Sequence, residues 1–246
     1  MPDHETGLTP ESPGDVINEV RKYFHTLATM GCRKIDCSVE SIEVMQKWGT
    51  GVGSRQVDRR TIAEVESMAR SCRRCSVTGD RARMVFGSGN PKAALMFVGD
   101  YPADEDGQQG LPFAGEAGNL LTKIIQAMGF TRENAYLCHA IKCRISEDPD
   151  SLQGQMEACR YLLQRQIEVV NPDIICTLGP IPTNALLDTR EPFSRLRGKF
   201  HRYNGIPVMP THHPAVLLKE EAKKRDVWED MKLVIKAIRE RKQRID

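Results

Sequence analysis

Long hydrophobic runs are missing from this sequence of 246 residues. None approaches the roughly 20 consecutive apolar residues that a bilayer-spanning helix needs, so we expect no membrane partner. Residues 1–15 are polar and acidic with three prolines, which excludes the pattern of a secretory or transit peptide. We therefore expect a cytoplasmic protein. In that compartment its eight cysteines favour metal ligation over disulfide bonds.

A strong net charge is also missing, because the formal value is only +2. That is too small to imply a nucleic-acid partner by itself. Acidic residues are absent between Pro192 and Lys219, however, and the basic residues of this stretch are Arg195, Arg197, Lys199, Arg202 and Lys219. Such a stretch fits contact with a phosphate backbone and equally fits a solvated basic loop, so charge alone leaves both interpretations open.

The hydrophobic pattern divides the chain into two parts. Residues 1–55 are predicted to be a disordered tail and a small helical appendage, because a stretch rich in Pro, Gly and acidic residues precedes helically spaced apolar positions. Residues 56–246 are predicted to form one α/β domain, in which short apolar runs alternate with amphipathic segments. The expected strands are Ala93–Val98, Ala135–Ile141, Asp173–Leu178 and Ile206–Met209.

One helix is expected before these strands, at residues 57–70. Others are expected between and after them, at residues 115–128, 150–170, 182–187, from about 214, and 226–241. This alternation predicts a three-layer αβα fold around a central, mostly parallel, four-stranded sheet. Ligands of such sheets bind at the carboxyl ends of the strands. We therefore expect Asp100 to Phe113, His139, and His212 to Pro214 to share one rim.

Four of the cysteines have spacing that suits a metal centre. Cys72 and Cys75 form a C-x2-C pair, Cys143 follows a predicted strand, and Cys159 lies inside a predicted helix. Four thiolates suit either a tetrahedral zinc ion or a four-iron cluster. The alternative is that Cys143 and Cys159 are buried core residues, as we expect for the strand residues Cys138 and Cys176. Cys32 and Cys37, in the appendage, are expected to be structural.

The rim combines a carboxylate, a presented aromatic ring and glycines at a helix start. Asp100 ends a strand, and Phe113 precedes the glycines that open the next helix. These groups suit a pocket for a flat polar ring. The alternative is a structural turn with Phe113 in the core.

Three separated motifs, together with the cysteines, resemble family 4 (iron–sulfur) uracil-DNA glycosylases. GDYPADEDGQQGLPFAGEAGNLL is similar to the family's first signature, GE(A/G)PG…G-x-PF-x-G-x-AG. YLCHAIKCRISED is similar to its middle segment, Y-x-TN-x-x-KCRPP, and LRGKFHRYNGIPVMPTHHPAVLLK to its closing segment, LRG-x…PT-x-HPA-x-LL. The resemblance covers about residues 68–238 and leaves the front section without an assigned activity.

This resemblance implies a uracil-DNA glycosylase-like fold and hydrolysis of the N-glycosidic bond of a deaminated base in DNA, which leaves an abasic site. It implies catalytic roles for Asp100 and His213, and base binding by Tyr101, Ala103, Phe113 and His139. It also implies a structural 4Fe-4S cluster held by Cys72, Cys75, Cys143 and Cys159. We expect Val216 and Leu217 to press into the duplex, single- or double-stranded DNA to be the partner, and the protein to be a monomer.

The motifs also depart from the family pattern. Asp100 stands for the usual Glu and reaches less far. Ala103 stands for a Gly, a change that would either narrow the approach or forbid a turn with positive φ. His139 stands for the Asn that reads the edge of uracil by two hydrogen bonds. Ile145 and Ser146 replace the usual Pro-Pro. Position 139 keeps two alternatives open: a glycosylase for hypoxanthine or xanthine, and a cluster-bearing DNA-binding module that has lost catalysis.

Overall fold

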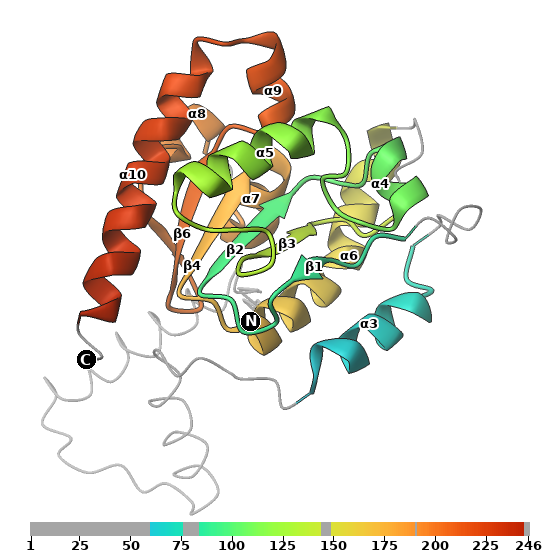
Figure 1. Ribbon diagram of the computed structural model, residues 1–246. Coiled ribbons are helices and arrows are strands. Elements are labelled where there is room, and N and C mark those ends of the chain that lie inside the picture. Colours follow the sequence, from blue (N-terminus) through green and yellow to red (C-terminus); the bar gives the residue numbers. More distant parts are fainter. Residues whose placement is uncertain (1–59, 76–83, 144–148, 190, 244–246) are drawn as a thin grey trace, which may run out of the picture. The chain divides into compact units, whose positions relative to one another are not determined.

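The computed structural model describes residues 60–75, 84–143, 149–189 and 191–243 (Figure 1). The predictions made for residues 1–55, including Cys32 and Cys37, and for Ile145 and Ser146 lie outside these residues.

A six-stranded sheet forms the centre of the described domain. Its strands are β1 (Ser88–Gly89), β2 (Leu95–Gly99), β3 (Tyr136–His139), β4 (Ile174–Leu178), β5 (His201–Tyr203) and β6 (Ile206–Thr211), in the order β1-β3-β2-β4-β6-β5. The inner four are parallel, with Gly99 opposite His139 and Leu178 opposite Thr211. All four were predicted from the sequence, and their carboxyl ends meet at one edge.

The prediction of four strands was incomplete, because two short edge strands were not foreseen. β1 and β5 pair antiparallel with β3 and β6, respectively. β1 has two residues and β5 three, and none of the five is fully buried. Strands this short and this exposed produce no apolar run, which is the signal that revealed the inner strands.

Helices cover both faces of the sheet. One face carries α5 (Glu116–Ala127), α9 (Pro214–Lys219) and α10 (Lys223–Lys242). Leu121, Leu217 and Met231 of these helices join Phe97 and Cys176 of the sheet in one buried cluster. The three helices lie on the same side of the sheet in Figure 1, so this face forms one layer of the predicted αβα arrangement.

The opposite face is covered by α6 (Pro149–Val170) and α7 (Pro180–Leu187). Leu163 and Ala185 pack there against Val98 and Cys138. α3 (Ile62–Arg70) packs on the outside of α6. Cys138 and Cys176 are each 0% exposed, which confirms them as core residues.

Two short helices escaped prediction. α4 (Asp104–Gln109) has the sequence DEDGQQ, and α8 (Phe193–Leu196) has four residues, so neither is long enough for apolar periodicity. α3 begins later than predicted, at Ile62, because Thr61 and Glu64 form a reciprocal capping box at its start. Among the described residues, no helix is long and apolar enough to cross a bilayer.

Candidate active site

Asp100 lies at the carboxyl end of β2 in an apolar setting. Burial raises its pKa to about 7. Its Oδ1 atom is buried without a hydrogen-bond partner among the described residues. Gly179 adjoins it with a φ of +101°, and a Cβ there would lie 3.0 Å from that oxygen. The backbone therefore comes close to Asp100 only because residue 179 is glycine.

Phe113 is held in a strained backbone conformation above the sheet edge. Its φ is +58°, a region that non-glycine residues rarely adopt. Two features accompany it: Arg132 donates to the carbonyl oxygens of Pro112 (2.6 Å) and Phe113 (3.2 Å), and Gly118 permits a close approach, since a Cβ there would lie 1.8 Å from the Phe113 oxygen. α5 thus supports the Phe113 backbone directly.

The Phe113 ring contacts two of the predicted site residues. Its centroid lies 4.5 Å from that of His139 and 6.0 Å from that of His213. The ring is only 5% exposed and belongs to the buried cluster beside α5. The structure therefore places Phe113 in the core, at the point where the core reaches the rim, and a pocket for a flat ring beside it stays a prediction.

His213 is the N-cap of α9 and is fixed in one tautomer. The Ala215 N–H donates to its Nδ1 over 3.1 Å, so the proton of a neutral ring resides on Nε2. Burial, followed by the influence of His139, lowers the pKa of His213 to about 4. At neutral pH the ring is an uncharged donor through Nε2.

His139, at the end of β3, pairs with a carboxylate that the sequence did not single out. Its Nε2 lies 2.9 Å from Oδ2 of Asp106 in α4, and the side chains are 2% and 4% exposed, respectively. Asp106 Oδ1 also accepts from Ala114 N–H (2.7 Å), and its Oδ2 accepts from Ala103 N–H (3.2 Å). One carboxylate therefore ties the loop after β2 to His139.

The departure at Ala103 causes no backbone conflict. Ala103 has φ −75° and ψ 176° as the N-cap of α4, so no positive φ is required there and that part of the expectation is wrong; a narrower approach stays a prediction. Tyr101 is 37% exposed beside Asp100. Both residues lie in the rim loop, as predicted.

Arg197 and Leu217 differ from their predicted roles. Arg197 makes two 3.1 Å hydrogen bonds to Asp230 and a 3.3 Å ion pair with Asp226, so it braces α10 and is not free for phosphates. Asp230 also accepts from Thr211 Oγ1 over 2.6 Å.

Leu217 is 1% exposed because it packs in the core, whereas the next residue, Leu218, is 41% exposed.

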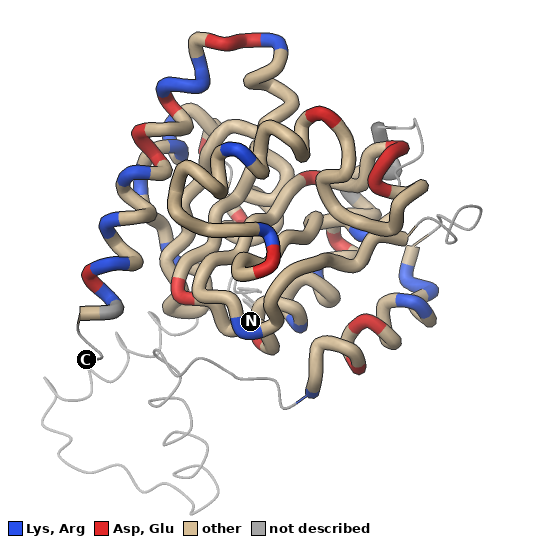
Figure 2. Tube along the Cα trace, in the orientation of Figure 1, with Lys and Arg blue, Asp and Glu red and all other residues tan. Residues whose placement is uncertain are grey.

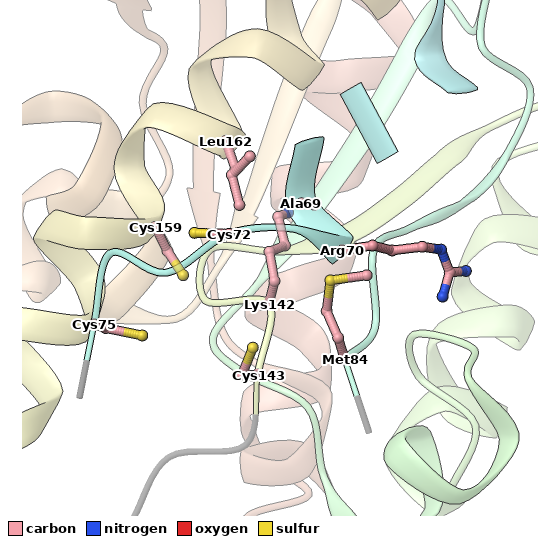
Figure 3. A pocket seen from close by; sticks show the side chains of 9 residues that line it. All are labelled: Ala69, Arg70, Cys72, Cys75, Met84, Lys142, Cys143, Cys159 and Leu162. Atoms are coloured by element: carbon pink, nitrogen blue, oxygen red, sulfur yellow. The ribbon is translucent and has the colours of Figure 1, made fainter. Parts of the chain in front are cut away.

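The four predicted cysteine ligands line one pocket away from the rim (Figure 3). Cys72, Cys75, Cys143 and Cys159 come from three separate chain segments, and their sulfur atoms surround a common space. Among the described side chains, no three potential ligands converge tightly enough for one metal ion. Zinc requires all its sulfurs within about 2.3 Å of the ion, whereas a four-iron cluster spreads its thiolates over separate irons. Four cysteines around one space are the donor set that either group uses.

A buried lysine completes this pocket. Lys142 is 1% exposed, and its closest charge partners include the thiols of Cys138, Cys159 and Cys143. Its Nζ donates to the carbonyl oxygen of His139. Burial lowers the pKa of Lys142, and the neighbouring cysteines act in the opposite direction. Lys142 also joins the cysteine pocket to the rim.

Sequence reasoning missed Asp106, Arg132, Lys142 and Asp230. Asp106 lies inside the first motif, and Lys142 directly precedes Cys143, but no local pattern says which atoms they meet. Asp106 and Asp230 each meet a partner 33 positions away along the chain, His139 and Arg197, respectively. Arg132 meets Phe113, 19 positions away, and Lys142 meets His139, 3 positions away. For Asp106 and Lys142, the one available signal was that each is a polar residue within a motif.

Comparison with known proteins places the chain among DNA-repair proteins. A model of the uracil DNA glycosylase superfamily matches residues 86–232. The chain is 36% identical over 178 residues to the type-4 uracil-DNA glycosylase of Saccharolobus solfataricus, which covers 69% of this chain and 82% of that relative. The enzyme of the same name from Thermotoga maritima is 33% identical over 171 residues, or 68% and 89% of the two chains. That from Archaeoglobus fulgidus is 30% identical over 172 residues, or 67% and 86%.

Asp100→Asn should stabilise the protein at neutral and alkaline pH. The folded pKa of about 7 lies above the ordinary 3.8, so the cost of ionising the buried acid is absent below about pH 4, grows up to about pH 7 and is complete above it. Asparagine has no such cost. Urea denaturation should give a gain on the order of 2–4 kcal/mol at about pH 8 and almost none at about pH 4.

Asp188→Asn is the matched control, because that carboxylate is 80% exposed and asparagine tolerates its left-handed backbone. It should show no comparable pH dependence. A gain for Asp100→Asn that is equal at both pH values would contradict the burial argument.

Proposed function

The chain belongs to the type-4 uracil-DNA glycosylases, and on that premise we propose that it hydrolyses the N-glycosidic bond of uracil in DNA and leaves an abasic site. The observation that carries this proposal is the meeting of Asp100, Phe113 and His213 at the carboxyl ends of parallel strands. A buried carboxylate, an aromatic face and a neutral imidazole donor are the three groups that the reaction needs.

Phe113 supplies the surface for the extruded base. The anomeric carbon is unreachable inside a duplex, so the nucleotide must leave the stack first. Stacking on an aromatic side chain contributes roughly 1–3 kcal/mol per base. The hydrogen bonds from Arg132 hold the Phe113 backbone in place, so no ordering is needed when the base arrives.

His213 stabilises the departing base. As the glycosidic bond breaks, negative charge develops on the uracil, including its O2 atom. The Nε2–H of His213 donates to O2, and because the pKa of the ring is about 4, the ring begins and ends the step neutral. The hydrogen bond strengthens as charge develops, which lowers the barrier rather than the ground state.

Asp100 acts on the sugar side. As a carboxylate it orients and polarises the attacking water and stabilises the oxocarbenium-like sugar. Its raised pKa, about 7, makes it a stronger base than an exposed aspartate. The backbone of Gly179 packs closely against this carboxyl group, which helps to hold the shorter side chain in position.

Exposed basic residues of the stretch that precedes His213 contact the phosphates. Arg195, Lys199 and Arg202 are exposed, as is Lys219 at the end of α9. Figure 2 shows basic and acidic residues interleaved along α10, which does not favour that helix as a DNA surface. Leu218, exposed on α9, replaces Leu217 as the wedge residue.

Cys72, Cys75, Cys143 and Cys159 hold a 4Fe-4S cluster in this proposal. The cluster supplies a structural cross-link, since glycosidic hydrolysis transfers no electrons. It ties the segment after α3 and the end of the β3 loop to α6. If these cysteines are thiolates in the loaded protein, their negative charge favours the protonated form of Lys142, whose pKa burial alone lowers.

His139 favours a second candidate substrate class. Its imidazole replaces the two-bond amide reader, so hypoxanthine and xanthine are alternative bases. Retention of Asp100, Phe113 and His213 in one site argues for an enzyme over a binding module without catalysis.

Base release from oligonucleotides tests the function. We expect wild type to release uracil from single- or double-stranded DNA, with kcat/KM rising as pH increases through about 7 because Asp100 must ionise. Hypoxanthine and xanthine substrates, with His139→Asn in parallel, identify the preferred base. If wild type releases nothing while His139→Asn releases uracil, position 139 was the switch and uracil is not the natural substrate.

Asp100→Asn and His213→Ala should each lower uracil release by about 10²- to 10³-fold, as removal of a charge-stabilising group does. His212→Ala is the control, because His212 packs edge-on against Phe193 instead of Phe113. An equal loss in all three variants would point to unfolding rather than to catalysis.

Cys72→Ala should yield a colourless, poorly folded protein with little bound iron, since one of four cluster ligands is lost. The amount of bound cluster is measured by absorbance in the sulfur-to-iron charge-transfer bands and by the iron content per chain. Cys138→Ala, on a buried strand, is the control and should stay coloured. A brown, stable Cys72→Ala protein would rule out that ligand.

Lys142→Met should reduce the iron retained during dialysis against a chelator, because the thiolates lose their buried counter-charge. Arg70→Met is the matched control: Arg70 lines the same pocket but its side chain is 67% exposed. Equal iron retention by both variants would remove Lys142 from this role.

A further inference from the structure

Asp106 is an ionised acceptor that is buried against His139. Burial alone would raise its pKa, but the hydrogen bond from His139 and those from the Ala114 and Ala103 N–H groups together lower the pKa below its ordinary value. Three donors thus surround one carboxylate. Such a carboxylate has no proton to donate.

His139 is therefore held in one tautomer. Burial lowers its pKa more than the bond to Asp106 raises it, so the ring is neutral and carries one N–H. Because Asp106 only accepts, this proton lies on Nε2, and Nδ1 keeps a lone pair. His213 has the opposite arrangement, with its Nδ1 occupied and its Nε2–H free for the ligand.

The Nδ1 atom of His139 is buried and has no hydrogen-bond partner in the part of the chain that the structure describes. It lies beside β2, where a Cβ on Gly99 would come within 2.7 Å of it and within 2.5 Å of the Phe113 ring. A buried acceptor left without a donor is unfavourable. Its place beside Phe113 suits a donor on a stacked base.

We propose that Asp106 and His139 form a specificity-determining pair, in which Asp106 fixes His139 as an acceptor that selects bases with an N–H at the edge facing Nδ1. The inference rests on the proposed function and names how that site chooses its base. Uracil presents N3–H, whereas N3 of cytosine is itself an acceptor and would meet the Nδ1 lone pair. Asp106 is a positioning residue, since it acts through His139.

The pair reads the base differently from an asparagine. An amide offers one acceptor and one donor, and so contacts two atoms of uracil. His139 offers only the acceptor, because its donor is used by Asp106. Exclusion of cytosine then depends on the tautomer, and hence on a residue that does not touch the base.

The first test measures the tautomer and base binding without hydrolysis. In ¹⁵N-labelled full-length protein, the His139 ring shifts should show Nε2–H. Free uracil should move the Nδ1 resonance, whereas cytosine and 3-methyluracil, which lack that N–H, should not. An Nδ1–H tautomer, or equal shifts with all three bases, would overturn the inference. These outcomes hold even if no base is released from DNA, a result that would contradict only the proposed function.

The second test reverses the selection. In Asp106→Asn the side-chain amide donates to Nε2, so the proton moves to Nδ1, which becomes a donor that matches cytosine N3. The ratio of uracil to cytosine affinity should fall by about ten- to a hundred-fold. The same change in an His139→Asn background is the control and should leave the ratio unchanged. A general loss of binding with the ratio preserved would mean that Asp106 is only structural.

Discussion

The carboxylate of Asp106 is the contact on which the rim depends. Its two oxygens accept hydrogen bonds from the backbone at Ala103 and Ala114 and from the ring of His139. These bonds close the loop between β2 and α5, which places Phe113 over the strand ends. A neutral side chain of the same size cannot accept all three, so ionisation of Asp106 and the shape of the loop are coupled.

Burial divides the site into groups with different protonation states. Asp100 has few polar neighbours, and its pKa rises to about 7, while Asp106, surrounded by donors, has a lowered pKa and stays ionised. His213 stays neutral for the same reason that Asp100 resists ionisation: an apolar site disfavours charge. Two carboxylates and two imidazoles thereby take on distinct tasks within one rim.

Lys142 connects the rim to the cysteine pocket. Its ammonium lies among cysteine thiols and donates to the His139 carbonyl oxygen. The segment from Cys138 to Cys143 thus carries a core cysteine, a buried histidine at the rim, the buried lysine and a cysteine that lines the pocket. Lys142 is therefore a direct structural link between the cysteine pocket and the end of β3.

The sequence by itself determined the parallel core, the cysteine set and the rim residues, because apolar runs of strand length and motif spacing are local properties. It did not reveal β1, β5 and α4, which are too short to carry periodicity, nor the burial of Leu217 or the pairing of Arg197 with Asp230. Only the tertiary structure decided the tautomer of His139 and the pKa of Asp100. Both depend on which distant groups surround a side chain, and chain spacing carries no record of that.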